Sequence, residues 1–341
     1  MNTTLNIVIF KELENCKLCA WECGVDRTAG EQGVCMSGIP EVASCQLHPA
    51  PPQSFTVFTC HCNFRCLNCQ NWEIAHYPCT KTSIRGYVDP NLIAREGVDG
   101  IHSIMGKLLR ADRFFFSGGS PTVSLPWIEE VVSHAKTLDP QVKVNFDTNG
   151  FPSRSSFQRI LSFSDSITFD IKAFHDEVHR ALSGAPVEPV LKNAEEMARH
   201  RDQLWEFRIL VIPSIIDLAE IQAIVEFIVG LDETLPISFL TFRPNFCLDS
   251  HPGASEKLMQ KTVSLAHDAG LVSVNWAGFP DIPGNLCVLP SSYQNQFTYL
   301  QTAYAMYYAN QAGCKQTHRY CKGCNYQISC KLKGYKPFRI R

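Results

Sequence analysis

A regular alternation of short β-type runs with amphipathic helical segments constrains the fold of this chain more than any other feature. Six runs rich in β-branched and aromatic residues predict strands at residues 54–58, 113–116, 142–146, 166–169, 206–211 and 237–242. Helices are predicted between and after them at residues 92–109, 127–138, 155–161, 189–199, 219–229 and 256–269. Because strands that alternate with helices pair in parallel, the sequence predicts an α/β fold with a parallel sheet.

Length and composition exclude several classes of protein. With 341 residues, 45% of them hydrophobic, the chain can bury one large core and carry small appendages. A formal net charge of -2 gives no electrostatic case for nucleic acid or an anionic membrane as a partner. The apolar runs are too short for a membrane span, and the run at residues 7–10 is too short for a signal peptide. We therefore expect a cytoplasmic protein.

The chain contains 16 cysteines, which in a reducing compartment predict metal ligation rather than disulfides. A first group lies in a glycine-containing segment near the N-terminus and consists of Cys16, Cys19, Cys23 and Cys35. Four thiolates at this spacing can wrap one metal tetrahedrally, and zinc, a single iron and a cluster all remain open. A second group near the C-terminus consists of Cys314, Cys321, Cys324 and Cys330. It also predicts a metal site, with zinc and an auxiliary iron–sulfur cluster as alternatives.

The third group is a C-x3-C-x2-C loop formed by Cys62, Cys66 and Cys69, directly after the apolar run at residues 55–58. Three thiolates on one loop can bind three irons of a cubane 4Fe–4S cluster, because soft sulfur ligands suit iron–sulfur chemistry. The fourth iron then stays open for the amino and carboxylate groups of a substrate. The alternative is a structural zinc loop that takes its fourth ligand from elsewhere in the chain.

Residues 62–72, Cys-Asn-Phe-Arg-Cys-Leu-Asn-Cys-Gln-Asn-Trp, resemble the radical S-adenosylmethionine (SAM) superfamily, and within it the proteins related to pyruvate formate-lyase activating enzyme. The resemblance implies a partial (β/α)6 radical SAM barrel, a 4Fe–4S cluster on the three loop cysteines, and SAM. We accordingly expect a four-cysteine metal-binding head at residues 1–50, the barrel at 51–278 and a cysteine-rich C-terminal extension at 279–341. The extension is expected to cover the open side of the barrel.

Chemistry in parallel barrels lies at the carboxyl ends of the strands, and three strand ends resemble family motifs. Ser-Gly-Gly-Ser-Pro at residues 117–121 resembles the Gly-Gly-Glu-Pro motif, whose backbone binds the amino group of SAM; Ser120 replaces the glutamate. The resemblance implies that Asp147, Thr148 and Asp170 bind Na+ or K+, and oxygen ligands suit such a hard cation. It implies SAM contacts from Gly118, Gly119, Ser120, Asn149, Lys172, Arg208 and Val211.

The resemblance further implies hydrogen abstraction from a protein or peptide substrate, at a backbone Cα, with electrons from ferredoxin or flavodoxin. The product is then either a C-methylated residue, as in the methanogen enzymes that methylate a glutamine of methyl-coenzyme M reductase with cobalamin, or a glycyl radical. The head and tail cysteines favour methylation, since simple activases need neither. Residues 249–253 are one residue short of a cobalamin fingerprint, which counts against this cofactor. A non-enzymatic metal or electron carrier is a third interpretation.

Overall fold

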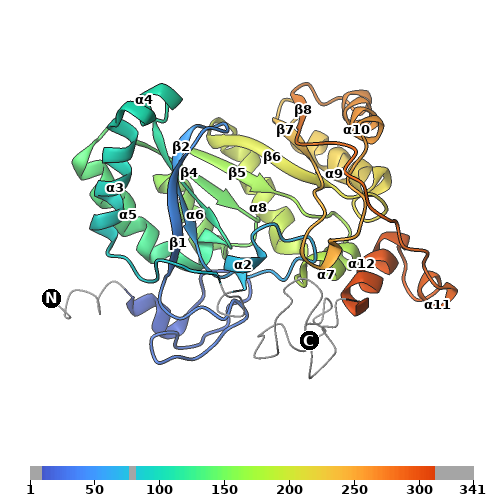
Figure 1. Ribbon diagram of the computed structural model, residues 1–341, viewed down its shortest axis with the longest axis horizontal. Coiled ribbons are helices and arrows are strands. Elements are labelled where there is room, and N and C mark those ends of the chain that lie inside the picture. The colour runs from blue at the N-terminus through green and yellow to red at the C-terminus, as the bar shows by residue number, and fades with distance from the viewer. Residues whose placement is uncertain (1–9, 77–81, 312–341) are drawn as a thin grey trace. The chain divides into compact units, whose positions relative to one another are not determined.

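The computed structural model describes residues 10–76 and 82–311, and every structural statement below concerns these residues. The protein has an α/β fold with an eight-stranded sheet in the order β1-β2-β3-β4-β5-β6-β7-β8 (Figure 1). β1 pairs with β2 antiparallel, whereas β2–β3, β3–β4, β6–β7 and β7–β8 are parallel pairs. The predicted α/β class with its mostly parallel sheet is therefore confirmed.

The strands are β1 (Val42–His48), β2 (Ser54–Thr59), β3 (Arg113–Gly118), β4 (Lys143–Thr148), β5 (Ser166–Asp170), β6 (Leu204–Val211), β7 (Ile237–Thr241) and β8 (Val274–Ala277). All six predicted strands are present with bounds shifted by at most a few residues. β1 and β8 were not predicted. β8 has no buried residue and β1 is buried only at its start, so neither has the apolar run by which a strand is recognised.

The helices are α2 (Trp72–Ala75), α3 (Pro90–His102), α4 (Ile104–Leu109), α5 (Leu125–Leu138), α6 (Arg154–Phe163), α7 (Asp176–Ser183), α8 (Glu188–Arg199), α9 (Leu218–Leu231), α10 (Glu256–Asp268), α11 (Ser291–Gln294) and α12 (Leu300–Gln311). Short 3-10 helices are η1 (Lys11–Asn15), η2 (Pro121–Ser124), η3 (Arg201–Gln203) and η4 (Phe246–Leu248). The predicted helix at 92–109 breaks at Ser103, whose hydroxyl accepts a hydrogen bond from Gly106 N and caps α4. None of these helices is long and apolar enough to cross a membrane.

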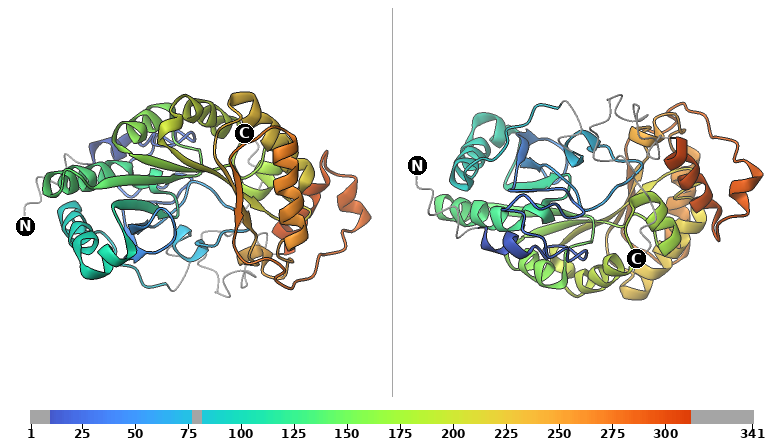
Figure 2. Two further views of the ribbon diagram at one scale, coloured as in Figure 1. Left: turned by 90° about the horizontal axis from the view of Figure 1, so that it is seen from above. Right: turned by 90° about the horizontal axis from the view of Figure 1, so that it is seen from below.

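The chain divides into two compact units. Unit 1 comprises Met1–Asn63 and Glu73–Thr168, and unit 2 comprises Phe64–Trp72 and Phe169–Arg341. In unit 1, α3 and α5 lie side by side, and α3 packs on β2 (Figures 1 and 2). In unit 2, α10 contacts α9, β7 and β8, while α12 packs against α7 (Figure 1). The predicted domain bounds stay a prediction.

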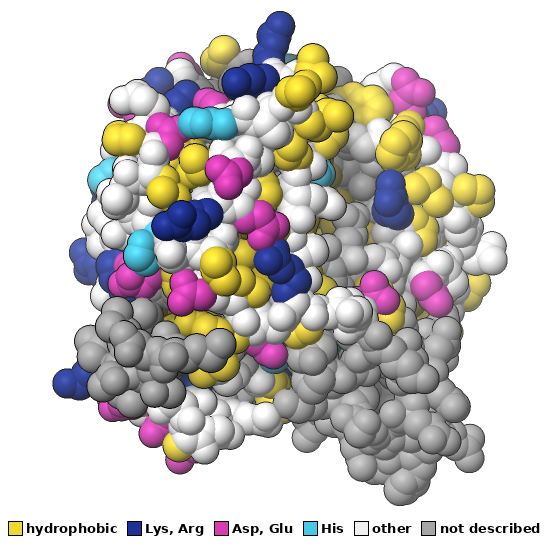
Figure 3. All heavy atoms as spheres, turned by 60° about the vertical axis from the view of Figure 1, so that its left-hand side comes forward, with side chains coloured by type: hydrophobic (Ala, Val, Ile, Leu, Met, Phe, Trp, Pro, Cys, Tyr) yellow, Lys and Arg dark blue, Asp and Glu magenta, His cyan; other side chains and the backbone are white. Residues whose placement is uncertain are grey.

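The core of unit 1 is aromatic where α3 meets the sheet. The rings of Phe55 and Phe114 are 5.7 Å apart in an edge-to-face arrangement, and both are buried. α3 approaches them closely because Gly97 and Gly100 have no side chain: a Cβ at Gly100 would lie 3.0 Å from Phe55 Cδ2. On the outer face, α4 exposes Ile104, Met105 and Leu108. Figure 3 shows apolar side chains gathered at the upper edge of that view, with charges of both signs mixed over the face.

Gly97→Ala should destabilise the protein by about 1–3 kcal/mol, because a Cβ there overlaps the buried Phe114 ring and forces the core apart. The matched control is Gly230→Ala in α9, where no atom lies within 4 Å of the added Cβ. That change should be neutral or stabilise by up to about 1 kcal/mol, because alanine has the higher helix propensity. Urea unfolding of both variants measures this. Equal urea midpoints for the two variants would show that the contact between α3 and Phe114 tolerates a Cβ at position 97.

Candidate active site

The segment after β2 is held by backbone hydrogen bonds to its neighbours in unit 1. Cys60 N donates to Glu41 O at 2.9 Å, and His61 N donates to Ile74 O at 2.9 Å. His61 has a left-handed backbone (φ 68°), and its Nε2 lies 2.9 Å from Glu41 Oε2. Cys62 is buried directly after this turn. Cys62, the first predicted cluster ligand, therefore directly follows two residues whose amides are held by hydrogen bonds.

The predicted SAM-binding loop after β3 packs directly on that segment. Gly119 N donates to Thr59 O at 2.9 Å, and Ser120 N donates to His61 O at 2.8 Å. A Cβ at Gly118 would overlap the Thr59 backbone, and a Cβ at Gly119 would overlap His61 O. Gly118 also has φ 119°, which glycine adopts without strain. Both glycines are thus required by the close approach of two backbones.

Ser120, which stands where the family motif has glutamate, is 2% exposed. Its hydroxyl has no hydrogen-bond partner among the described residues. A buried hydroxyl without a partner costs free energy unless a ligand supplies one. The amides of Gly119 and Ser120 already donate hydrogen bonds to the segment after β2. The loop therefore offers hydrogen-bond acceptors, rather than donors, to the ammonium group of SAM. This donor–acceptor balance fits the predicted ligand.

The end of β4 brings a third motif to the same place in unit 1. Asn149 Nδ2 donates to Asn63 Oδ1 at 2.7 Å, next to Cys62 in the chain. Ser117 Oγ donates to Asp147 Oδ2 at 2.6 Å, which joins the ends of β3 and β4. Thr148 is buried, and its Oγ1 accepts from Gly150 N at 3.1 Å. The motifs after β2, β3 and β4 therefore meet as the strand-end argument predicts.

Cys66 and Cys69 belong to unit 2, where the loop packs on two helical segments. Arg65 N donates to Ser183 O at 2.7 Å and Leu67 N to Leu182 O at 2.9 Å, so the loop lies against the end of α7. Cys247 N in η4 donates to Leu67 O at 3.0 Å. Two ring contacts add to these bonds, one between Phe64 and His179 at 5.4 Å and one between Trp72 and Phe246 at 5.5 Å.

Cys60 and Cys62 are both buried, whereas the other two loop cysteines are more accessible. Burial, and secondarily the charge of Glu41, raises the pKa of the Cys60 thiol to about 12, so this thiol stays protonated near neutral pH. Cys66 and Cys69 are only partly buried. Cys62, Cys66 and Cys69 suit a three-thiolate cluster in their donor chemistry and their sequence spacing. Among the residues that the structure describes their side chains are not gathered as a metal-binding group, so the cluster site stays a prediction.

The charged residues predicted at the end of β5 and within β6 already form ion pairs in unit 2. Lys172 Nζ donates to Asp170 Oδ2 at 2.7 Å. Arg208 Nη2 donates to Glu206 Oε1 at 2.9 Å. Val211 is fully buried at the end of β6. A cation at Asp170 or a carboxylate at Lys172 would therefore have to compete with this ion pair.

Glu220 in α9 is a residue that the sequence analysis missed. Its side chain is 1% exposed, and Oε1 accepts from His175 N at 2.9 Å while Oε2 lies 2.7 Å from His175 Nδ1. Oε1 also accepts from Phe174 N. This carboxylate thus holds the segment that follows Lys172. The sequence did contain one signal for Glu220, because it is an acidic residue on the apolar face of a predicted helix.

The head cysteines lie within electrostatic reach of one another. Burial raises the pKa of Cys19 far above its ordinary value, and negative charge at Cys35, Cys23 and Cys16 acts in the same direction. In the part of the chain that the structure describes, no three His, Cys, Asp or Glu side chains are gathered as a metal-binding group. Metal binding by the head therefore stays a prediction.

The tail cysteines Cys314, Cys321, Cys324 and Cys330 lie outside the described residues. In the described part of the extension, Tyr308 of α12 is buried and its hydroxyl lies 2.8 Å from His251 Nδ1. His251 Nε2 donates to Pro213 O at 2.8 Å, and burial lowers the pKa of His251 to about 4. With both ring nitrogens engaged, His251 is a poor candidate for a cobalamin ligand.

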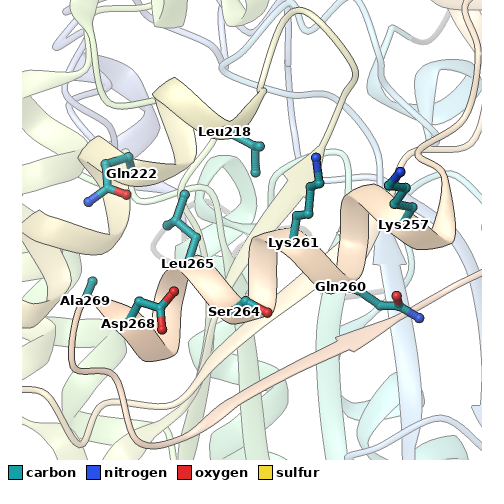
Figure 4. Close-up of a pocket in the computed structure, with 9 residues that line it drawn as sticks. All are labelled: Leu218, Gln222, Lys257, Gln260, Lys261, Ser264, Leu265, Asp268 and Ala269. Atoms are coloured by element: carbon teal, nitrogen blue, oxygen red, sulfur yellow. The ribbon is translucent and has the colours of Figure 1, made fainter.

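A separate groove of about 690 Å³ lies between α9 and α10. Leu218 and Gln222 line it from α9, and Lys257, Lys261 and Asp268 line it from α10 (Figure 4). None of the predicted cluster, SAM or cation ligands lines this groove. It is therefore distinct from the strand-end motifs.

Comparison with known proteins agrees with the motifs. The model of the radical SAM superfamily matches residues 56–228, just over half of the 341-residue chain. An uncharacterised protein of Methanocaldococcus jannaschii is 25% identical over 278 residues, 77% of this chain and 76% of that protein. Pyruvate formate-lyase-activating enzyme of Staphylococcus aureus is 24% identical over 201 residues, 56% of this chain and 75% of the enzyme.

Two solved structures are similar in part. A domain of pyruvate-formate lyase-activating enzyme from Bacteroides vulgatus matches with a TM-score of 0.40 and 23% identity, covering 48% of this chain and 98% of that one. Streptococcus suis SuiB bound to the precursor peptide SuiA matches with a TM-score of 0.45 and 14% identity, covering 64% of this chain and 46% of that one. From the superfamily match and the motifs that coincide with it, the chain belongs to the radical SAM superfamily.

Proposed function

We propose that this radical SAM enzyme abstracts a hydrogen atom from a backbone Cα of a protein or peptide substrate. The proposal rests on one observation: within unit 1, the segment around Cys62 is hydrogen-bonded to Gly119 and to Asn149. Membership of the superfamily implies a 4Fe–4S cluster and SAM. A protein substrate is supported by the Staphylococcus aureus relative, whose name makes it the activator of another enzyme.

Cys62, Cys66 and Cys69 would hold the cluster through their thiolates. When bound and reduced by a donor such as ferredoxin or flavodoxin, the cluster supplies the electron that cleaves SAM and releases a 5′-deoxyadenosyl radical. The protein's part is to bind and orient, because hydrogen abstraction by a radical needs no general base. The absence of a recognisable acid–base pair among the predicted site residues agrees with this chemistry.

The remaining site residues are assigned to SAM and its cation. The Ser120 hydroxyl and the carbonyls of the glycine loop accept hydrogen bonds from the SAM ammonium group. Lys172 exchanges Asp170 for the SAM carboxylate, which frees Asp170 to join Asp147 and Thr148 around Na+ or K+. This exchange gives Lys172 the SAM carboxylate and Asp170 the cation as new partners, which matters because half-buried charges are costly when left alone. Arg208 and Val211 are assigned to the nucleoside part of SAM.

For the fate of the substrate radical we propose C-methylation, with methyl-coenzyme M reductase as a candidate target class and cobalamin as a candidate carrier. Support comes from the head and tail cysteine groups, because the activating-enzyme match covers only 56% of this chain. Glycyl-radical-enzyme activation is the second candidate, favoured by the same relative's name. The two fates differ in their products, which makes them separable.

Cys66→Ala should abolish 5′-deoxyadenosine formation, because two thiolates would not hold the cubane cluster whose open iron binds SAM. The matched control is Cys45→Ala, a β1 cysteine outside the three groups, which should retain SAM cleavage. Both proteins are reconstituted anaerobically and reduced with dithionite, and the nucleoside is measured by mass spectrometry. Wild-type rates from the Cys66→Ala protein would remove the cluster assignment.

Asp147→Asn should raise the SAM concentration needed for half-maximal cleavage by about tenfold or more, because the cation loses a charged ligand. The Na+ and K+ dependence of cleavage should weaken in parallel. Asp232→Asn is the control, since Asp232 caps α9 at the surface and its bonds to Thr234 can be kept by asparagine. Unchanged activity after complete exchange into a large organic cation would contradict a monovalent-cation site.

Substrate turnover should distinguish the two fates. With a protein substrate present, C-methylation yields 5′-deoxyadenosine together with S-adenosylhomocysteine, because a second SAM is the source of the methyl group. Activation yields 5′-deoxyadenosine alone and leaves a glycyl radical that EPR detects on the substrate. A glycyl signal without S-adenosylhomocysteine would replace methylation by activation, and neither product with any protein substrate would contradict both.

A further inference from the structure

Within unit 2, the C-terminal extension runs along the loop that joins η4 to α10. Gly253 N donates to Ile282 O at 2.9 Å, and Asn285 N donates to Ser250 O at 2.8 Å. A Cβ at Gly284 would lie 2.6 Å from the backbone of this loop, so the two segments approach too closely for a side chain. This part of the extension is therefore fixed to the loop.

His251 lies in the same loop and joins two other elements of unit 2. It is 0% exposed, and burial lowers its pKa to about 4, so the ring is neutral near pH 7 and carries one N–H proton. Nε2 lies 2.8 Å from Pro213 O, which can only accept, so the proton is on Nε2. Nδ1 then accepts from the Tyr308 hydroxyl of α12 at 2.8 Å. The imidazole thus links α12 to the segment after β6 through two directional hydrogen bonds.

The segment that His251 reaches is a strained turn. Residues 212–216 close on themselves through backbone hydrogen bonds, and Ser214 within them has φ 62°. A left-handed backbone at a residue other than glycine costs free energy and persists only where the surroundings hold it. His251 holds this turn at Pro213, directly before Ser214. The turn follows Val211, the residue assigned above to the nucleoside part of SAM.

α12 also contacts an element that supports the loop of the predicted cluster ligands. It packs on η4. In η4, Phe246 stacks on Trp72 with ring centroids 5.5 Å apart, and Cys247 N donates to Leu67 O at 3.0 Å, inside the cysteine loop. The helix therefore bears on two predicted sites of unit 2: the cysteine loop through η4, and the turn after β6 through His251.

The start of α12 is anchored separately from Tyr308. Thr298 N donates to Glu177 Oε1 at 3.0 Å, and Gln301 Nε2 donates to Asp217 Oδ1 at 3.0 Å. α12 also packs along α7. Because these contacts hold the helix in place, loss of the Tyr308 hydroxyl should act on the turn after β6 while α12 stays docked.

We propose that His251 is a positioning residue that connects the docked C-terminal extension to the turn after β6, so that α12 fixes the shape of the turn assigned to the SAM nucleoside. It acts through Pro213 rather than by touching SAM or the substrate. The superfamily model ends at residue 228, so His251 and α12 lie outside the part of the chain that it matches. The link itself is independent of the enzyme's activity, whereas its effect on SAM rests on the proposed function.

Tyr308→Phe removes one of the two hydrogen bonds of His251 and keeps the ring contacts. In the full-length protein, amide hydrogen exchange of residues 212–216 should become about two- to tenfold faster, the factor expected for loss of one hydrogen bond between neutral groups. Mass spectrometry of peptides that cover the turn measures this. Exchange equal to wild type in Tyr308→Phe would overturn the link.

Two controls accompany Tyr308→Phe. Tyr307→Phe makes the same change at the neighbouring position, where the ring contacts Tyr293 and the hydroxyl forms no hydrogen bond within the described residues. Cys287→Ala removes the other hydrogen-bond partner of the Tyr308 hydroxyl. Exchange of the turn should stay as in wild type in both. Acceleration in Tyr307→Phe equal to that in Tyr308→Phe would show that the effect does not pass through His251.

Two substitutions of His251 separate its bonds. The amide nitrogen introduced by His251→Gln can take the place of Nε2 and donate to Pro213, whereas the amide oxygen introduced by His251→Asn can take the place of Nδ1 and accept from Tyr308. The turn should therefore stay better protected in His251→Gln, and the last turn of α12 better protected in His251→Asn. Equal protection of both segments in the two variants would overturn the bridging role, and Tyr308→Phe decides if either variant fails to fold.

The dissociation constant of SAM tests the consequence for the candidate site. Equilibrium dialysis of the anaerobically reconstituted protein should show about two- to tenfold weaker SAM binding in Tyr308→Phe than in Tyr307→Phe. Faster exchange of the turn with unchanged SAM affinity would overturn the positioning role and leave the link. If the wild-type protein binds no SAM, the proposed function fails, and the exchange experiment still decides the link.

Discussion

The candidate active site depends on a contact between two backbone segments, and this contact leaves no room for a side chain. The segment after β2 and the loop after β3 meet through hydrogen bonds from Gly119 N to Thr59 O and from Ser120 N to His61 O. Cys62 follows the first segment, and Ser120 follows the second. Because both partners are backbone, the contact fixes the segment that leads to Cys62 relative to the loop after β3 without any flexible side chain between them.

Buried charges hold backbone segments in each of the two units. Arg27 reaches from the head to η2, and Glu220 reaches from α9 to the backbone after Lys172. Each charge holds backbone groups that lie within a few residues of a predicted ligand. Lys172 and Asp170 neutralise each other at the end of β5. Such charges are costly unless their partners are fixed, so they specify one arrangement of the loops more sharply than apolar packing does.

Much of this could be predicted from the sequence, because the signals are local. The six central strands are apolar runs, and the motifs after β2, β3 and β4 meet because parallel strands end at one edge. β1 and β8 were missed because few or none of their residues are buried. The helix break at Ser103 depends on a hydroxyl cap that propensity does not reveal. Arg27 and Glu220 were missed because their partners are distant backbone groups, which no spacing rule identifies.

The most direct test of the central claim is the EPR spectrum of the reduced, anaerobically reconstituted protein with and without SAM. If the loop after β3 presents SAM to a cluster held by Cys62, Cys66 and Cys69, SAM should shift the signal of the reduced 4Fe–4S cluster. The shift should disappear in Gly119→Ala, whose Cβ overlaps His61 O, while cluster iron is retained. A cluster signal that SAM leaves unchanged in the wild-type protein, or a normal shift in Gly119→Ala, would contradict this account.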